Sequence, residues 1–507
     1  MNKTPANSRY FFLSAVLMCG AFVLVFIPTA INRLVAIDEG FYLLAAKLVD
    51  TGRTPYLDFF YPQAPLFPYL LKLLSFPFDI NWSTGRLVAG FSAVLIGLLL
   101  YLHIYLRHGK GFALLGGILF LSSHLVYGWY TIVKPYSVPL MLLFAAYFLI
   151  EHLKKKNISL ILLTSGLLLG LSINSRLLMA VAAPVLLLGV IWKAQAVQAG
   201  SLKSTAFFLA GCLIATLPSL YLCTVDFDAF WLNNVGYHQL RSTAANSVFA
   251  WNSEKMTRLF AFIGLADAQG PYGSQFPWLF WISVLYVPLA LYKRQSVFSL
   301  ALAIALFIAH VLPPRVHLQY FCTVVPFLII VLSDFGATLF ALFKGSTVKL
   351  ILRSFAVCFV CYYAFQGYDH YERYTKTGQL ILSSSVTASL TVPQIKEVSA
   401  LIDSYTTAGE MVYALWPGFL VTSHAKAISG MENNFGFRIA DKFSKEVRAS
   451  YKLLTLDEQR EFLRSKQISI AVYAKDRLPS KDRRVLQKTG YKVIKETASA
   501  FIYRLPD

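Results

Sequence analysis

Long apolar segments alternate with short polar ones over the first 366 residues of the chain. About 20 consecutive apolar residues are enough to cross a membrane as a helix. On this basis the pattern predicts about eleven transmembrane helices, near residues 11–30, 86–106, 112–129, 136–152, 158–175, 177–193, 204–223, 276–292, 296–312, 317–341 and 349–366. The predicted fold class is therefore mainly α, a polytopic membrane protein.

The pattern changes after residue 366 to a mixture of polar and apolar positions. Helical periodicity is seen over 391–406 and 441–465, and short apolar runs typical of strands occur at 411–415, 468–473 and 501–504. We therefore divide the chain into a transmembrane domain, 1–366, and a small α/β domain outside the membrane, 367–507.

Composition supports the membrane assignment. Of 507 residues, 56% are hydrophobic and only 14% are charged, more apolar surface than a soluble domain buries. The net charge of +20 would suggest nucleic acid for a soluble protein. Here the basic residues gather between apolar segments, which indicates membrane topology and a fit to anionic membrane lipids, with no nucleic-acid partner. The six cysteines lie in or at the ends of apolar segments and form no metal-binding pattern.

The basic clusters fall on one side of the predicted helices, which orients the chain in the membrane. With the N-terminus in the cytoplasm, the inner loops contain the clusters at 107–110, 154–156, 193–203, 293–294 and 344–349. An odd number of spans then places the C-terminal domain on the outer side of a plasma or bacterial inner membrane. The long first loop, 31–85, faces outward as well.

This first outer loop opens with two adjacent carboxylates, Asp38 and Glu39. A helix-period apolar stripe follows from Asp38 to Asp50, and we expect this helix to lie flat with its apolar face toward the lipid boundary. Prolines at 62, 65 and 68 exclude a regular helix before Phe67. Asp38 and Glu39 are candidates for catalysis; the alternative is that they cap the helix and offset its dipole.

Residues 37–42, with the aromatic and proline-rich stretch 59–70, resemble the first outer loop of the polytopic GT-C glycosyltransferases. The resemblance is to the protein O-mannosyltransferase and aminoarabinose transferase superfamily in particular. It implies a GT-C-like fold and a glycosyltransferase with a polyprenyl-phosphate-linked sugar as donor. It also implies inverting transfer on the outer face to a lipid, glycan or protein acceptor, with Asp38 as the base that activates the acceptor.

The resemblance has a gap at Gln63 and Ala64, where the aminoarabinose branch has an acid and a lysine. Metal binding and phosphate clamping therefore do not carry over to these positions. Tyr61 and Gln63 are instead candidates for hydrogen bonds to the sugar or the phosphate. The alternative is an aromatic residue of the interface belt and a capping amide.

Other outward cations can replace the missing lysine in neutralising the phosphate. Arginine suits bidentate phosphate binding better than lysine, although any of these cations can also snorkel to the interface. Asp226 and Asp228 are weaker candidates for holding sugar or a divalent ion, with helix capping as the alternative. No cofactor is required by the sequence, and a divalent metal stays open. The full set of substrate-binding candidates is Tyr61, Gln63, Lys134, Arg176, Asp226, Asp228, Arg315, His317 and Tyr320.

Two other functional classes fit a polytopic protein. A flippase, ligase or polymerase of lipid-linked glycans usually places its long working loop late in the membrane domain, and the loop 224–275 keeps this alternative open. A secondary transporter would call for repeated halves with broken helices, and neither is found in the sequence.

Overall fold

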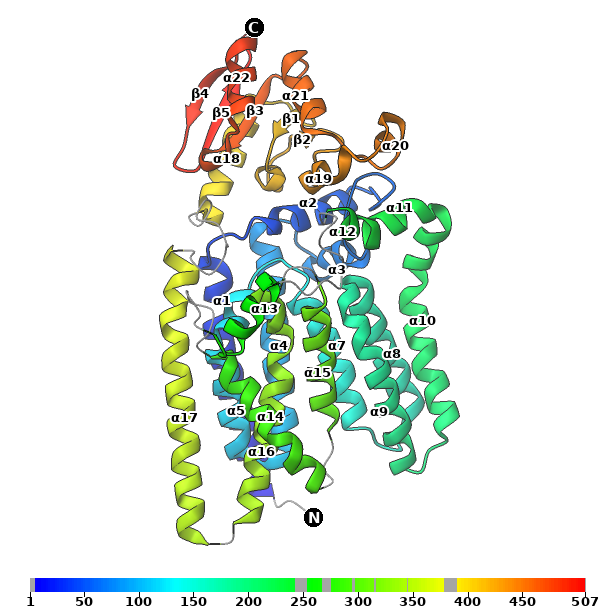
Figure 1. Cartoon of the computed structure of the whole chain (residues 1–507), viewed down its shortest axis with the longest axis vertical. Coiled ribbons are helices and arrows are strands. Elements are labelled where there is room, and N and C mark those ends of the chain that lie inside the picture. Colours follow the sequence, from blue (N-terminus) through cyan, green and yellow to red (C-terminus); the bar gives the residue numbers. More distant parts are fainter. Residues whose placement is uncertain are drawn as a thin grey trace.

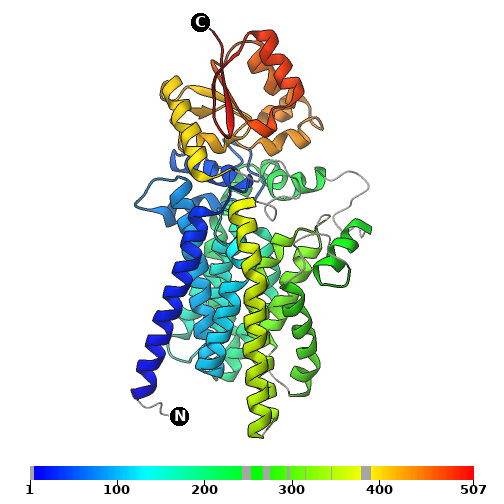
Figure 2. The ribbon, with the colours of Figure 1, turned by 90° about the vertical axis from the view of Figure 1, so that its left-hand side faces the viewer.

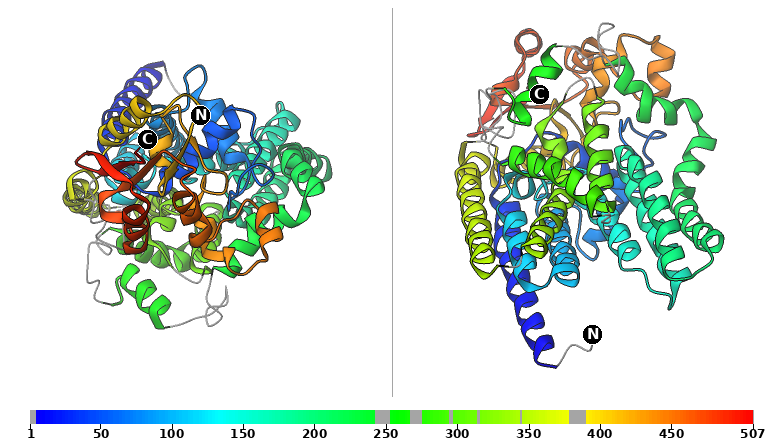
Figure 3. Two further views of the ribbon diagram at one scale, coloured as in Figure 1. Left: turned by 90° about the horizontal axis from the view of Figure 1, so that it is seen from above. Right: turned by 60° about the horizontal axis from the view of Figure 1, so that its bottom comes forward.

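The computed structural model describes residues 5–241, 253–266, 275–293, 297–313, 316–343, 345–377 and 390–506. It has a tall layer of apolar helices and, at one end of that layer, a small sheet flanked by helices (Figure 1). Helix α1 begins at the end of the layer far from the sheet, as two views at right angles show (Figure 2). Seen from above, the sheet region lies over the helices (Figure 3).

The helical layer contains every stretch that the sequence predicts to cross the membrane. Its helices are α1 (Pro5–Asn32), α4 (Trp82–His108), α5 (Lys110–Ser122), α7 (Ser137–Glu151), α8 (Ile158–Ser175), α9 (Ala182–Ala196), α10 (Ser201–Val225), α14 (Phe276–Tyr292), α15 (Phe298–Val311), α16 (Val325–Leu342) and α17 (Ser346–Glu372). Within the described residues, seven helices are long and apolar enough to span a membrane. Helices α5, α7, α14 and α15 are apolar but shorter, so the count of eleven spans stays a prediction.

Short elements join these helices. They are α2 (Asp38–Asp50), α3 (Leu66–Ser75), α6 (His124–Trp129), η1 (Leu177–Val181), α11 (Phe227–Trp231), η2 (Leu232–Gly236), α12 (Tyr237–Leu240), α13 (Ser253–Phe262), η3 (Leu318–Thr323) and η4 (Arg373–Thr377). Helix α2 has the bounds that the apolar stripe predicts. Helix α3 begins at Leu66, one residue earlier than expected, because Pro65 occupies the N-cap position and Pro68 lies in the first turn, where a missing N–H costs little.

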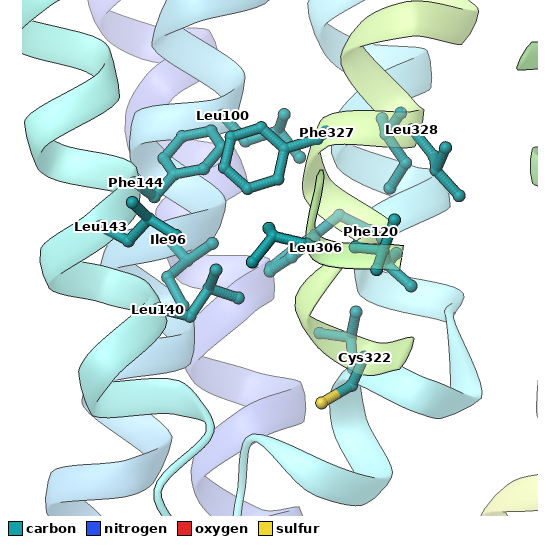
Figure 4. Packing of buried hydrophobic residues seen from close by; sticks show 14 of the residues in the cluster. Ile96, Leu100, Phe120, Leu140, Leu143, Phe144, Leu306, Cys322, Phe327 and Leu328 are labelled. Atoms are coloured by element: carbon teal, nitrogen blue, oxygen red, sulfur yellow. The ribbon is translucent and has the colours of Figure 1, made fainter. Parts of the chain in front are cut away.

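Apolar side chains fill the centre of the helical layer. Figure 4 shows Leu140, Phe144 and Phe327 packed together with side chains from several helices. Small residues let two helices approach closely: a Cβ at Gly166 of α8 would lie 1.9 Å from the Phe208 carbonyl oxygen of α10. Such contacts are typical of helices that pack within a membrane.

The C-terminal region forms one mixed five-stranded sheet in the order β2-β1-β3-β5-β4. Strand β1 runs parallel to β2 and β3, whereas β5 is antiparallel to β3 and β4. The strands are β1 (Met411–Ala414), β2 (Lys426–Ala427), β3 (Ile470–Ala474), β4 (Lys492–Glu496) and β5 (Ala500–Arg504). The helical segments are α18 (Val392–Tyr405), η5 (Pro417–Leu420), η6 (Asn434–Gly436), α19 (Phe437–Ala440), α20 (Lys445–Ser450), α21 (Leu456–Arg464), η7 (Lys475–Arg477) and α22 (Ser480–Thr489).

Side chains alternate between the two faces of this sheet. Val412 and Val472 lie in the cluster that includes α18, whereas Tyr413 and Tyr473 lie in the cluster that includes α21 and α22. The sequence predicts a single helical stretch over 441–465, but the chain forms α20 and α21 instead. A left-handed residue, Lys452 with φ of 57°, ends the first segment, and Thr455 caps the second.

Helix α2 lies between the helical layer and the sheet (Figure 1). Its apolar residues, Phe41 and Leu44 among them, are buried in a cluster shared with η5 and α18, so the expectation that they face lipid is wrong. The contact with η5 is close: a Cβ at Gly40 would lie 2.7 Å from the Cα of Gly418. Lys47 fixes the other end of α2 by donating to the Leu420 carbonyl at 3.0 Å.

Candidate active site

Asp38 occupies the first turn of α2 without capping it. The N-cap position is Ile37, and no side chain makes a capping bond there. The Asp38 carboxylate instead forms an ion pair with Lys134, with 2.8 Å between Oδ2 and Nζ. The Asp38 side chain is 36% exposed, whereas Lys134 is only 6% exposed. Capping does not explain Asp38, and its carboxylate is both positioned and accessible.

The surrounding charges keep Asp38 ionised. Burial raises the pKa of its carboxyl, but Lys134, together with Arg438, more than offsets this effect and lowers the pKa below its usual range. Arg438 comes from α19 of the C-terminal region. Asp38 is therefore a carboxylate at neutral pH, the form that accepts a proton.

Glu39 has a different environment from its neighbour. Its side chain is fully buried, and Arg86 of α4 donates to both of its oxygens, at 2.9 and 2.8 Å. The backbone N–H groups of Ala36 and Val133 donate to the same two oxygens at 2.8 and 3.1 Å. Glu39 thus joins the start of α2 to α4 and to the segment that carries Lys134.

Lys134 lies in the turn between α6 and α7. Its Nζ is 5.3 Å from the centre of the Trp129 ring and 6.0 Å from that of Tyr136, within the range of cation–π attraction. These aromatic walls shield the ammonium group from solvent, which strengthens its interaction with Asp38.

Arg176 follows the end of α8 and is buried. Its guanidinium stacks 4.5 Å from the Tyr136 ring and 5.5 Å from the Tyr320 ring. One Nη donates to the Pro135 carbonyl at 3.0 Å, but Nε has no hydrogen-bond partner among the described residues. A buried arginine with an unused donor and no acid beside it in the described chain is suited to an anionic ligand.

Tyr42 and His317 complete this group. Tyr42 is one turn after Asp38 on α2, so both side chains lie on one face of the helix. Burial first, then the charge of Asp38, raises the pKa of Tyr42 well above its usual range, so it offers a neutral hydroxyl. Burial and the charge of Lys134 lower the pKa of His317 to about 4, so its imidazole is neutral at pH 7.

The structure thus brings five of the predicted residues together. We define the Asp38 cluster as Asp38, Tyr42, Lys134, Tyr136, Arg176, His317 and Tyr320, of which Tyr42 and Tyr136 were not predicted. Electrostatic coupling joins Tyr42 to Asp38, Tyr136, Arg176 and Tyr320. The His317 ring lies 5.2 Å from the Tyr320 ring.

Tyr61 and Gln63 lie behind this cluster rather than in it. The Tyr61 ring packs edge-on against Tyr42, with 6.3 Å between centroids, and its hydroxyl is buried without a partner in the described chain. The backbone of Gln63 accepts a hydrogen bond from the Tyr56 hydroxyl at 2.5 Å. Both residues therefore belong to the packing beside α2. Their contact with substrate stays a prediction.

The remaining candidates are placed as follows. Asp226 caps α11 by accepting from the Ala229 N–H at 2.8 Å, which matches the capping alternative, and Asp228 is exposed in the same helix. Arg315 lies outside the described residues. Among those residues, no group of three or more His, Cys, Asp or Glu side chains is suited to holding a metal ion.

Several important residues had only a weak signal in the sequence. Tyr42 lies within the stretch 37–42, and Tyr136 comes two residues after Lys134; the spacing of four from Asp38 is the signal that points to Tyr42. Arg86 begins a predicted span and looks like an interface arginine. Arg438 lies 400 residues after Asp38, and no local pattern connects the two.

Comparison with known proteins supports the same architecture. A family model described as dolichyl-phosphate-mannose-protein mannosyltransferase matches residues 62–222, which include Lys134 and Arg176 but begin after Asp38. No curated protein sequence matches the chain.

Solved structures match over nearly the whole length. The crystal structure of ArnT from Cupriavidus metallidurans in the apo state matches with a TM-score of 0.64 and 14% identity, over 97% of each chain. The same ArnT bound to undecaprenyl phosphate matches with a TM-score of 0.65 and 14% identity, over 97% of this chain and 98% of that one. The chain therefore shares the fold of ArnT, and its residues 62–222 resemble the protein mannosyltransferase family.

Proposed function

We propose that this protein transfers a sugar from a polyprenyl-phosphate donor to a lipid, glycan or protein acceptor, with inversion at the anomeric carbon. The observation that carries the proposal is the ionised, accessible carboxylate of Asp38 among buried cations, in a chain with this fold. The ArnT structure with bound undecaprenyl phosphate supports the class of donor.

In the proposed reaction, an acceptor hydroxyl or amine attacks the anomeric carbon on the face opposite the phosphate. The bond between this carbon and the phosphate oxygen breaks as the new bond forms, so configuration inverts. Asp38 takes the acceptor proton, and polyprenyl phosphate leaves with the electron pair of the broken bond.

Charge on the leaving phosphate must be neutralised by nearby cations. Arg176 offers an unused buried donor, and Lys134 is the nearest ammonium group to Asp38. If Lys134 turns toward the phosphate when the donor binds, its ion pair with Asp38 weakens. The pKa of Asp38 then rises, and the carboxylate becomes a better base. Donor binding and base activation are coupled in this way.

We assign Glu39 a positioning role in place of the catalytic role first considered. Its two oxygens are already engaged by Arg86 and two backbone N–H groups, and its side chain is fully buried. Both features keep it away from an acceptor. It instead fixes the start of α2, where Asp38 lies.

We further propose that the Asp38 cluster faces the outer side of a bacterial inner membrane, with the N-terminus in the cytoplasm. The basic clusters at 107–110 and 154–156 support this orientation. Reporter fusions after residues 110 and 156 should indicate the cytoplasm, and a fusion at the C-terminus the outer side. A cytoplasmic C-terminus would overturn the orientation.

The test of function is Asp38→Asn in purified full-length protein given a panel of polyprenyl-phosphate sugars. Release of free polyprenyl phosphate measures turnover. Because the variant loses the charge and most of the basicity, turnover should fall by about 100-fold or more. Asp50→Asn is the matched control, since Asp50 ends the same helix in an exposed ion pair with Lys72. Equal turnover in both variants would remove Asp38 from the mechanism.

A further inference from the structure

A second group of buried donors lies around Arg33, directly after α1. The Arg33 side chain is 1% exposed, and its Nη1 donates to the Leu34 carbonyl at 3.0 Å. Its Nε and Nη2 have no hydrogen-bond partner, and no acid within the described ranges forms an ion pair with it. The carboxylate of Glu39, whose charge acts on Arg33, already accepts two hydrogen bonds from Arg86.

Aromatic rings enclose the Arg33 guanidinium. Its Cζ is 5.0 Å from the Trp129 ring centre and 5.1 Å from that of Tyr374. Cation–π contacts offset part of the cost of burying the charge, but they leave the in-plane N–H groups without acceptors. Nε and Nη2 of Arg33 are therefore free to donate hydrogen bonds to a ligand.

Two more side chains add to the same group of donors. The Trp129 indole N–H is buried without a partner in the described chain, and neither ring nitrogen of His124 has one; one of these two nitrogens is a donor in the neutral imidazole. The rings form a continuous cluster: Trp129 is 6.2 Å from Tyr374, and His124 is 6.5 Å from Tyr374. Buried polar groups without hydrogen-bond partners are rare in native proteins.

We propose that Arg33, Trp129 and His124 form a second anion subsite, distinct from Arg176, that holds the phosphate group of a membrane lipid. The arrangement offers donors and a fixed positive charge, so its ligand must be rich in acceptors and negatively charged. A neutral sugar or an ammonium group would leave the charge of Arg33 uncompensated.

The location favours a ligand from the membrane. Helix α17 contacts α6, which carries His124 and Trp129, and stands at the outside of the helical layer (Figures 1 and 2). Only 11% of its apolar 18-residue stretch is buried, the smallest share among the seven long apolar helices of the described chain. Its exposed residues include Phe365 and Tyr368. Most of the α17 surface is therefore turned outward, as expected for a helix that contacts membrane lipid on that side.

The subsite is separated from Arg176 by the residues in between. Trp129 lies next to Arg33, and the Lys134 ammonium lies 5.3 Å from the same indole ring. Lys134 in turn is paired with Asp38. The Arg33 subsite therefore lies next to the proposed active site, behind Trp129, and is suited to a phosphate lipid arriving at or leaving that site.

The experiment measures binding and does not require sugar transfer, so it is independent of the proposed function. Native mass spectrometry of the full-length protein counts bound farnesyl phosphate, with farnesol as the phosphate-free probe. Phosphatidylglycerol and inorganic phosphate are separate arms, which distinguish an anionic phospholipid or a free ion from a polyprenyl phosphate. We expect two farnesyl phosphates per parent chain and none of farnesol at these sites.

Arg33→Met should remove one of the two binding events, weakening it by about 10-fold or more, and Arg176→Met should remove the other. Trp129→Phe keeps the ring but removes the N–H, so it should weaken only the Arg33 event. Arg353→Met, at the opposite end of α17, is the matched control and should bind like the parent. Thermal unfolding checks that each variant is folded.

Two results would overturn the inference. If Arg33→Met and Trp129→Phe bind every phosphate probe like the parent, buried water completes these donors and there is no anion subsite. If one binding event weakens equally in Arg33→Met and Arg176→Met, a single phosphate spans both arginines and the second subsite does not exist.

Discussion

Glu39→Gln is the substitution that best tests the roles assigned to the two neighbouring carboxylates. The change keeps the size and shape of the side chain but replaces one oxygen by an NH₂ group. Four donors now converge on the Glu39 oxygens: two from Arg86 and one each from Ala36 and Val133. In the glutamine variant, the side-chain NH₂ group would face at least one of these donors, and two donors cannot form a hydrogen bond with each other.

The expected loss of stability is large because the pair is buried. The side chains of Arg86 and Glu39 are 1% and 0% exposed, so solvent does not screen the charge that is left on Arg86. Removing one partner of a buried ion pair costs about 3–5 kcal/mol. Asp38→Asn should cost less, about 1–3 kcal/mol, because the Asp38 side chain is 36% exposed, although the buried Lys134 ammonium loses its partner.

The assay compares the thermal midpoint and the turnover per folded molecule in both variants. Glu39→Gln should lower the midpoint strongly with a moderate effect on turnover, whereas Asp38→Asn should show the opposite profile. Adding Arg86→Met to Glu39→Gln should restore part of the stability, because no unpaired charge then remains. A Glu39→Gln variant that unfolds like the parent but has lost turnover would refute the positioning role and return Glu39 to the catalytic machinery.

Three further predictions concern the same region. Lys134→Ala removes the main group that lowers the pKa of Asp38, so the acid limb of the pH profile of turnover should move to higher pH; an unmoved limb would contradict the ion pair. Arg176→Ala should weaken binding of the donor lipid by about 1.5–3 kcal/mol, measured by titration, and unchanged affinity would assign Arg176 to packing alone. Gly40→Ala should destabilise by about 1–3 kcal/mol in thermal unfolding because its Cβ would meet Gly418, whereas Gly20→Ala in α1, with open space around it, should be neutral.

Much of the fold follows from local patterns in the sequence. Apolar runs of membrane length locate the long helices, and short apolar runs locate β1, β3 and β5. The sequence does not predict the two remaining strands, for different reasons. β2 has only two residues, Lys426 and Ala427, and β4, 492–496, is polar and exposed along most of its length. Neither carries the apolar pattern on which strand prediction depends.

The site is less accessible to such reasoning because its contacts are long-range. Asp38, Lys134 and Arg176 each stand at a polar break between apolar stretches, which made them candidates. Their assembly depends on how the helices pack, and sequence spacing does not encode this. The partner of Glu39 illustrates the limit: Arg86 comes 47 positions later, at the start of a span where arginine commonly serves as an interface anchor.

The position of α2 gives the C-terminal region a part in the proposed chemistry. Trp416 donates from its indole to the Ile37 carbonyl at 3.0 Å, directly before Asp38, and Trp82 of α4 donates to the Gly418 carbonyl at 3.2 Å. The first turn of α2 is therefore held from the sheet side by η5 and from the membrane side by Arg86. Because orientation of a proton acceptor contributes strongly to rate, loosening either contact should misplace Asp38 even where its charge is unchanged. The sheet region thus acts on Asp38 in two ways, through the backbone at Ile37 and through the charge of Arg438.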